Sequence, residues 1–100
     1  MQVTFRTRKL ERQYRESNKA VQAYGLKAGR RYIQRINIIK QARNLTELME
    51  LPALKCHPLS GNRKGQYAVT LIDRWRLIFT LKGSAMEIIN IEEVSKHYDD

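Results

Sequence analysis

The 100-residue sequence is poor in several residue types that define common protein classes. It has one cysteine, Cys56, and two prolines. A single cysteine cannot form a disulfide within the chain, and a zinc site needs more ligands. No stretch approaches the roughly 18 apolar residues that span a bilayer, and the N-terminus has early charges with no apolar segment behind them. We therefore expect a cytoplasmic protein, without disulfide or membrane segment, that forms one domain over residues 1–100.

Acidic residues are scarce in the first part of the chain. Residues 1–43 contain twelve basic and two acidic side chains, whereas residues 44–100 contain seven and eight, and the formal net charge is +9. A concentrated excess of arginine and lysine favours a polyanionic partner, because neutralised phosphates release condensed counterions. The plainer alternative is a solvated helix surface with spare basic residues. The excess of arginine makes nucleic acid the better prediction, but it names no target.

The apolar pattern is helical before Pro52 and alternating after it. Residues 7–17 and 19–43 have apolar residues at steps of three or four, and Gly25 and Gly29 make a break in the second segment possible. Asn44 and Glu47 resemble a capping box that precedes a short helix ending at Leu51. Strands are predicted at residues 66–72, 75–81 and 86–91, and residues 3–5 are a candidate edge strand.

This order of elements predicts an α+β fold, in which N-terminal helices pack on one face of a small antiparallel β-sheet. Tight turns at residues 73–74 and 82–84 favour an antiparallel meander. Trp75, Leu77 and Phe79 share one face of their strand, so Arg76 lies on the other. That other face of the sheet is expected to be partly open, with Arg76 pointing toward it.

Few residues can carry chemistry. The glycines between Ser60 and Gly65 are not in the order of a phosphate-binding loop, and no carboxylate cluster has metal-ligand spacing. Cys56 and His57 point to opposite sides of an extended chain, so they do not pair as nucleophile and base. Two histidines, a tyrosine and several arginines remain. Those residue types suffice for a metal-free ribonuclease, which needs a base, an acid and a cation for the charged transition state.

Two segments carry a resemblance to a known family. Residues 54–67 read LKCHPLSGNRKGQY, and residues 73–79 read DRWRLIF. Their order and spacing resemble the HigB branch of the RelE/ParE toxin superfamily, which has an HPLxGxxxG loop and an xWRxxF strand. The helical first half and the closing strand also fit, so the resemblance covers nearly the whole chain. It implies a RelE-like fold and a toxin of a two-gene toxin–antitoxin module, whose relatives cleave mRNA in the ribosomal A site.

The resemblance also implies roles for single residues. By position, His57 matches the loop histidine implicated in catalysis, and Arg76 matches the strand arginine that contacts the scissile phosphate. Ser60 stands where many relatives have a lysine. A cation used at that point must therefore come from Arg63 or Lys64, or be absent.

The C-terminal run departs from the family pattern as well. Many relatives end their sheet in an Asp-Tyr-His run, whereas this chain has His97, Tyr98 and Asp99, the same residue types in reverse order. The residues alone also allow a purely structural interpretation. In that interpretation His57 orders a loop, and His97 and Tyr98 belong to an ordinary surface tail.

The function predicted from these observations is that of a ribosome-dependent mRNA endonuclease that uses no metal and no cofactor. The predicted catalytic residues are His57, Arg76, His97, Tyr98 and Asp99. The predicted RNA-binding residues are Lys27, Arg30, Arg31, Arg35, Arg63, Lys64 and Arg74. The resemblance implies the ribosome and mRNA as partners, together with an antitoxin of helix-turn-helix, HigA-like type.

Two alternatives remain at this point. Members of the ParE type bind DNA gyrase and cut nothing, and the histidine loop argues against them. A plain nucleic-acid-binding module, such as a repressor, is the third interpretation. The sequence shows no helix-turn-helix with a short glycine turn and few side chains placed to read bases, which disfavours a repressor.

Overall fold

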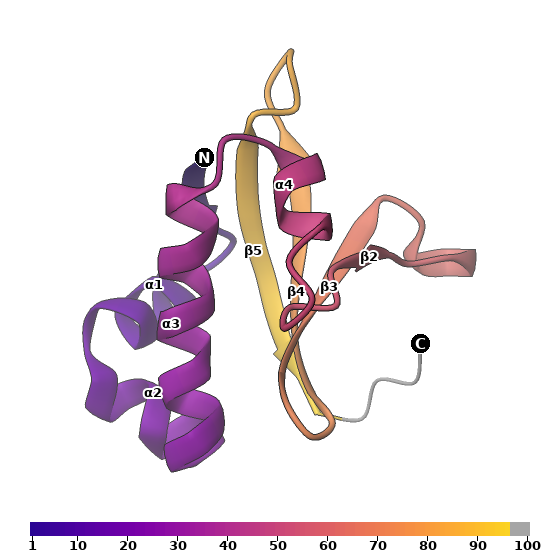
Figure 1. The fold of residues 1–100 in the computed structure, drawn as a ribbon. Coiled ribbons are helices and arrows are strands. Elements are labelled where there is room, and N and C mark those ends of the chain that lie inside the picture. Colours follow the sequence, from indigo (N-terminus) through magenta and orange to yellow (C-terminus); the bar gives the residue numbers. More distant parts are fainter. Residues whose placement is uncertain (97–100) are drawn as a thin grey trace.

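Figure 1 shows a computed structural model of the chain, which describes residues 1–96. The elements, in chain order, are β1 (Gln2–Phe5), α1 (Arg8–Arg15), α2 (Ser17–Tyr24), α3 (Leu26–Gln41), α4 (Leu45–Met49), β2 (His57–Pro58), the 3-10 turn η1 (Gly61–Arg63), β3 (Gln66–Ile72), β4 (Trp75–Lys82) and β5 (Ile88–Ser95). The helices α1–α3 gather on one side of the sheet (Figure 1). The predicted α+β class is confirmed.

The five strands form one sheet in the order β1-β5-β4-β3-β2. The predicted antiparallel meander of β3, β4 and β5 is confirmed. The edge strand β1 runs parallel to β5, from the pair Gln2–Ile88 to the pair Phe5–Ile91, so the sheet is mixed. This parallel pair joins the two ends of the described chain, and no local pattern in the sequence predicts such a pairing.

The strand β5 extends beyond its predicted end at Ile91. Its register with β4 shifts after the pair Phe79–Ile91, because the next pair is Ile78–Glu93. Glu92 is the extra residue of a β-bulge, which places Glu92 and Glu93 on the same face of the sheet. The bulge interrupts the alternation on which the prediction depended, and this explains why the second half of the strand was missed.

The long helical segment divides at Gly25, which has a φ of +87° between α2 and α3. Gly29, one turn into α3, has a different role. A Cβ atom there would lie 2.8 Å from backbone atoms of Ala20 and Val21, so only glycine allows α2 and α3 to approach this closely. Ser17 and Asn18 are residue types that commonly cap a helix, so the sequence predicts a cap for the second helix there. That prediction is wrong, because α2 already begins at Ser17 and its N-cap is Glu16.

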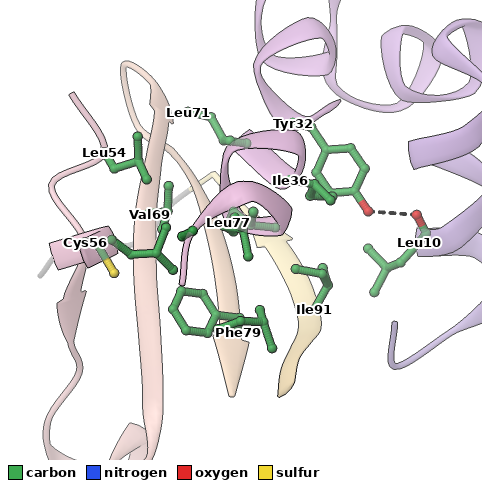
Figure 2. Close-up of a cluster of buried hydrophobic side chains, with 14 of the residues drawn as sticks. Leu10, Tyr32, Ile36, Leu54, Cys56, Val69, Leu71, Leu77, Phe79 and Ile91 are labelled. Atoms are coloured by element: carbon green, nitrogen blue, oxygen red, sulfur yellow. Dashed lines mark hydrogen bonds between the residues drawn. The ribbon is translucent and has the colours of Figure 1, made fainter. Parts of the chain in front are cut away.

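The core lies between the helices and the near face of the sheet. Its fully buried members include Ile36 on α3, Val69 on β3, Phe79 on β4 and Ile91 on β5 (Figure 2). The buried hydroxyl of Tyr32 donates to the carbonyl oxygen of Leu10 at 2.7 Å and ties α3 to α1 (Figure 2). Trp75, Leu77 and Phe79, which were expected to share the core-facing side of β4, all pack in or against this core.

The face of the sheet that is turned away from the helices is called here the far face. Leu59, Ala68 and Ile78 form a second, small buried cluster on it. Because Leu59 precedes η1, the loop of residues 59–65 packs over part of this face. The prediction of a partly open face is therefore confirmed. The loop covers the apolar cluster of Leu59, Ala68 and Ile78, and polar side chains occupy the positions beside it.

Candidate functional site

The sheet register brings the two predicted motifs to the far face. His57 on β2 lies opposite Ala68 on β3, and Ala68 lies opposite Ile78 on β4. Arg76 lies two residues before Ile78 on the same strand, opposite Thr70. Residues opposite one another in a sheet share a face, and so do residues two apart on a strand. His57 and Arg76 are therefore on one face, although the turn and the whole of β3 separate them in the sequence.

The imidazole ring of His57 is held by a hydrogen bond to a nearby backbone carbonyl group. Its Nδ1 atom lies 2.8 Å from the carbonyl oxygen of Lys55. A carbonyl oxygen can only accept, so Nδ1 carries the proton in the neutral ring. Nε2 is then the nitrogen with the lone pair, which is the form that a general base requires.

Arg76 is half-buried and directs its guanidinium toward the β3–β4 turn. Its Nη1 donates to the carbonyl oxygens of Asp73 at 2.6 Å and Trp75 at 3.2 Å. From the other side of the sheet, Arg31 on α3 donates to the carbonyl oxygen of Leu71 at 3.5 Å. Cationic side chains from both faces thus meet near this end of the sheet, where Arg74 is exposed in the turn itself.

Arg63 is the cation of the loop that reaches across the far face. Its Nη1 donates to Oε1 of Gln66 at 3.0 Å, and its Nη2 lies 3.4 Å from Oε1 of Glu93. The ion pair with Glu93 connects the loop before β3 to β5, on the other side of β4. Lys64, its neighbour in the sequence, is exposed. Arg63 is therefore the better positioned of the two cations that follow Ser60.

Three polar residues of β5 take part in the far face and were not singled out from the sequence. Oε2 of Glu92 accepts hydrogen bonds from Oγ1 of Thr80 at 2.7 Å and from Nδ2 of Asn90 at 2.6 Å. Glu93 holds Arg63 as described. The signal available in the sequence was the pair of adjacent carboxylates inside an apolar strand, a pattern that suggests a bulge or a built polar site.

The predicted RNA-binding residues of α3 are divided by the structure. Lys27, Arg30 and Arg31 are exposed, on the side of the sheet opposite His57. The prediction for Arg35 is wrong, because only 5% of this residue is exposed. Its guanidinium donates to the carbonyl oxygens of Thr70 and Ala53, among others, and burial lowers its pKa with a smaller contribution from Arg31. Arg35 thus links α3 to β3 and to the segment before β2 by hydrogen bonds in the interior of the protein.

The other titratable groups limit which chemistry is available. Burial raises the pKa of the Cys56 thiol to about 11, so the thiol is protonated near neutral pH and is not a nucleophile there. His97, Tyr98 and Asp99 lie outside the described residues. Within residues 1–96, no three side chains of His, Cys, Asp or Glu are grouped closely enough to hold a metal ion. No helix in this part of the chain has the length and apolar character needed to cross a membrane.

No protein-family model and no curated protein sequence matches the chain. Its fold is similar to solved structures of bacterial toxins. A YoeB/ParE toxin from Agrobacterium tumefaciens superposes with a TM-score of 0.63 at 17% identity, covering 98% of this chain and 100% of that one. YafQ from E. coli strain BL21(DE3) gives a TM-score of 0.59 at 17% identity, covering 95% and 91%. A YoeB–YefM complex from Staphylococcus aureus gives 0.61 at 21% identity, covering 98% of both chains. The helices and the five-stranded mixed sheet of this protein therefore have the RelE/YoeB-like toxin fold.

Proposed function

We propose that this protein is the toxin of a toxin–antitoxin module and cleaves mRNA on the ribosome. The observation that carries the proposal is that His57 and Arg76 lie on the same face of the sheet, the far face, which Arg63 also reaches. A base and a cation for the transition state are two of the three groups that metal-independent RNA cleavage requires, and the third is an acid. Arg63 adds a second cation that can bind phosphate. The toxin fold, shared over nearly the whole length of several solved structures, supports the same function.

The proposed reaction is transesterification within the RNA. Nε2 of His57 removes the proton from a ribose 2′-OH, and the 2′-oxygen then forms a bond to the adjacent phosphorus. Arg76 stabilises the negative charge of the phosphorane. The bond from phosphorus to the 5′-oxygen breaks, and an acid protonates the departing oxygen. The products are a 2′,3′-cyclic phosphate and a 5′-hydroxyl end, and no metal or cofactor is consumed.

The acid comes from the C-terminal run in this proposal. His97 or Tyr98 donates the proton, and Asp99 orients one of them. These assignments depend on the sequence resemblance. Arg63, Lys64 and Arg74 contact the RNA around the scissile phosphate, and Arg63 takes the part that a lysine at position 60 has in many relatives.

The remaining contacts belong to the ribosome and to an inhibitor. Lys27, Arg30 and Arg31 are exposed cations on the same helix, α3. Such a group of positive charges can bind the phosphates of ribosomal RNA. One similar structure is a complex of YoeB with YefM, and it supports an antitoxin as partner. We propose a helix-turn-helix, HigA-like antitoxin and action in the cytoplasm by a single domain of residues 1–100.

The test is cleavage of a defined mRNA on programmed ribosomes by the purified protein. We expect cleavage that EDTA does not inhibit beyond its effect on the ribosome, with 2′,3′-cyclic phosphate ends. Arg76→Ala should lower the rate by roughly 10²–10³, because the charge acts mainly in the transition state. Lys82→Ala removes an exposed cation from the end of the same strand and should leave the rate unchanged.

A second pair of variants tests the base. His57→Asn keeps an amide donor for the carbonyl oxygen of Lys55 but has no group that accepts the 2′-proton. It should therefore be as slow as His57→Ala. Truncation before His97 should also slow cleavage. When the truncation is combined with His57→Ala, the loss of rate should be much smaller than the sum of the two separate losses, since groups that act as a unit fail together. Intact mRNA together with inhibited DNA gyrase would instead support the ParE-like alternative.

A further inference from the structure

A groove lies between α1 and α2, on the side of the sheet opposite His57 and Arg76 (Figure 1). It has a volume of about 440 Å³, which is a common size for a small-molecule site. The described residues that line it include four cations and no carboxylate: Arg8, Lys9, Arg12 and Lys19. This surface is called the α1–α2 groove here. A hollow lined by one sign of charge concentrates counter-ions, so the α1–α2 groove attracts anions.

The sequence of the two helices gathers these cations. Arg8 and Arg12 are four residues apart on α1, so they lie on the same side of that helix. Lys19 lines the groove from α2. A single residue, Glu16, separates α1 from α2, and this short connection keeps the cations of both helices next to one another.

Few carboxylates balance the charge of the α1–α2 groove. The helix α2 contains no acidic residue. The acidic residues of α1 and of its C-cap each pair with an arginine, Glu11 with Arg15 and Glu16 with Arg12. The other three groove cations make no ion pair within residues 1–96. Their charge is therefore available to a bound anion.

Gln13 adds a hydrogen-bond donor to the groove. It follows Lys9 by one helical turn, lines the groove and is only 4% exposed. Its amide oxygen accepts a hydrogen bond from the hydroxyl of Tyr24. Its amide nitrogen makes no hydrogen bond within residues 1–96, so two N–H donors remain. A buried polar group without a protein partner needs an explanation, and an anion in the groove supplies one.

The concentration of cations indicates the class of anion. A nucleic-acid strand carries one negative charge per nucleotide, so only a small part of its charge fits in a groove of this volume. A chain of linked phosphates places all its charge there. Its oxygens also suit the guanidinium groups of Arg8 and Arg12, which can each donate two parallel hydrogen bonds to a phosphate.

We propose that the α1–α2 groove binds the polyphosphate chain of a small molecule. The four cations of the groove neutralise the phosphates, and the amide nitrogen of Gln13 donates to one of the phosphate oxygens. The site is separate from the candidate nuclease site, and the proposal does not depend on nuclease activity. Absence of cleavage would leave it unaffected, and absence of polyphosphate binding would leave the cleavage assay as it stands.

Inorganic polyphosphate and nucleoside triphosphates share this chemistry. A second groove of about 460 Å³ has Lys9, Gln13 and Ala23 in common with the first, so the two adjoin. Leu10 and Tyr24 are among the residues that line the second groove. The base of a nucleotide would lie against them, whereas an inorganic chain ends within the first groove.

The experiment is a titration of the ¹⁵N-labelled full chain with sodium tripolyphosphate in a metal-free buffer. We expect saturable shifts of the backbone amides of α1 and α2 and of the side-chain NH₂ signals of Gln13. Orthophosphate should bind at least tenfold more weakly, because one phosphate group meets fewer of the cations. Citrate should also bind at least tenfold more weakly, because its carboxylates carry less charge than three phosphates.

Adenosine triphosphate distinguishes the two sources. If the ligand is a nucleotide, adenosine triphosphate should bind more tightly than tripolyphosphate and should also shift the amides of Leu10 and Tyr24. If the ligand is an inorganic chain, the two affinities should be equal and the shifts should stay within the lining of the α1–α2 groove.

Two charge-matched double variants locate the site. Arg8→Gln together with Lys19→Gln removes one groove cation from each helix and should lower the affinity for tripolyphosphate about tenfold. Lys55→Gln together with Lys82→Gln changes the net charge equally at exposed positions outside the groove and should leave the affinity unchanged.

Four outcomes would each overturn the proposal. The first is an equal loss of affinity in the two double variants, and the second is an unshifted Gln13 side chain at saturation. The third is citrate binding as tight as that of tripolyphosphate. The fourth is a ten-nucleotide RNA that shifts the Gln13 side chain more strongly than tripolyphosphate does.

Discussion

Nε of Arg35 on α3 donates to the carbonyl oxygen of Thr70 on β3 at 3.1 Å, and its Nη2 donates to the carbonyl oxygen of Ala53 at 3.4 Å. Thr70 is also the residue opposite Arg76 on the far face. Arg35 therefore joins the central helix, the segment before β2 and the strand beside the candidate site. A buried arginine in this position supports the geometry of the site from the helical side.

Replacing Arg35 by glutamine should lower the free energy of unfolding by about 2–3 kcal/mol, because the partly buried carbonyl oxygens of Thr70 and Ala53 lose their charged donor. Chemical denaturation measures this loss. Arg30→Gln removes an exposed arginine from the same helix and should change the stability by less than about 0.5 kcal/mol. A stable Arg35→Gln protein with weakened ribosome binding would restore the original interpretation of Arg35 as an RNA contact.

The exposed cations of α3 should act through salt-dependent affinity. The double variant Lys27→Glu, Arg30→Glu should sediment less with ribosomes, and the slope of log affinity against log salt should become shallower by somewhat under 1 for each lost phosphate contact. Lys55→Glu together with Lys82→Glu is the charge-matched control, since both lysines are exposed elsewhere. Equal loss of sedimentation in the two double variants would mean that net charge alone is responsible.

The sequence predicts the central hairpin well, because its information is local. β3 begins at Gln66 and ends at Ile72 as predicted, and β4 begins at Trp75, since apolar alternation and a two-residue turn act together. The face of Arg76 followed from the same alternation. The face of His57 could not, because it depends on the pairing of His57 with Ala68.

The failures share one physical reason, which is long-range packing. Nothing near Gln2–Phe5 indicates that these residues pair in parallel with β5. Arg35 follows Arg31 by one helical turn and looks like a further surface cation, until β3 packs against it. The bulge at Glu92 removed the alternation that would have extended β5. Each feature depends on a partner far away in the chain.

Alkaline pH should destabilise the fold. Burial raises the pKa of Cys56 from 9.0 to about 11 and that of Tyr24 from 10.0 to about 12, and burial together with Tyr24 raises the pKa of Tyr32 as well. The folded protein thus holds these groups neutral while the unfolded chain releases their protons. The stabilisation is fully present below about pH 9 and is lost as the pH rises toward 12.

Urea denaturation between pH 7 and pH 11 measures this loss. The free energy of unfolding should be level up to about pH 9 and then fall with increasing slope. Cys56→Ala should flatten the first part of the fall, between about pH 9 and 11, because one of the contributing groups is absent. An unchanged stability up to pH 11 in the parent protein would contradict the assignment of these three groups.

The last prediction concerns Glu93 as a positioning residue for Arg63. Its carboxylate lies 3.4 Å from Nη2 of Arg63, and both side chains are partly exposed, at 41% and 33%. Glu93→Ala should allow the loop of residues 59–65 to move, and amide exchange of Gly61–Gly65 should become faster. On the proposed reaction, kcat should fall by about tenfold to a hundredfold, because the cation is no longer held in place. KM should not rise, since a negative charge has left the face that binds RNA.

Glu93→Gln separates positioning from proton transfer. The amide oxygen of glutamine still accepts a hydrogen bond from Arg63, so loop exchange and most of the cleavage rate should be retained. If Glu93 itself moved a proton, glutamine would be as inactive as alanine. The amide-exchange measurement is made on the free protein and does not require nuclease activity. Unchanged exchange at Gly61–Gly65 in Glu93→Ala would show that Gln66 and the packing of Leu59 hold the loop without Glu93.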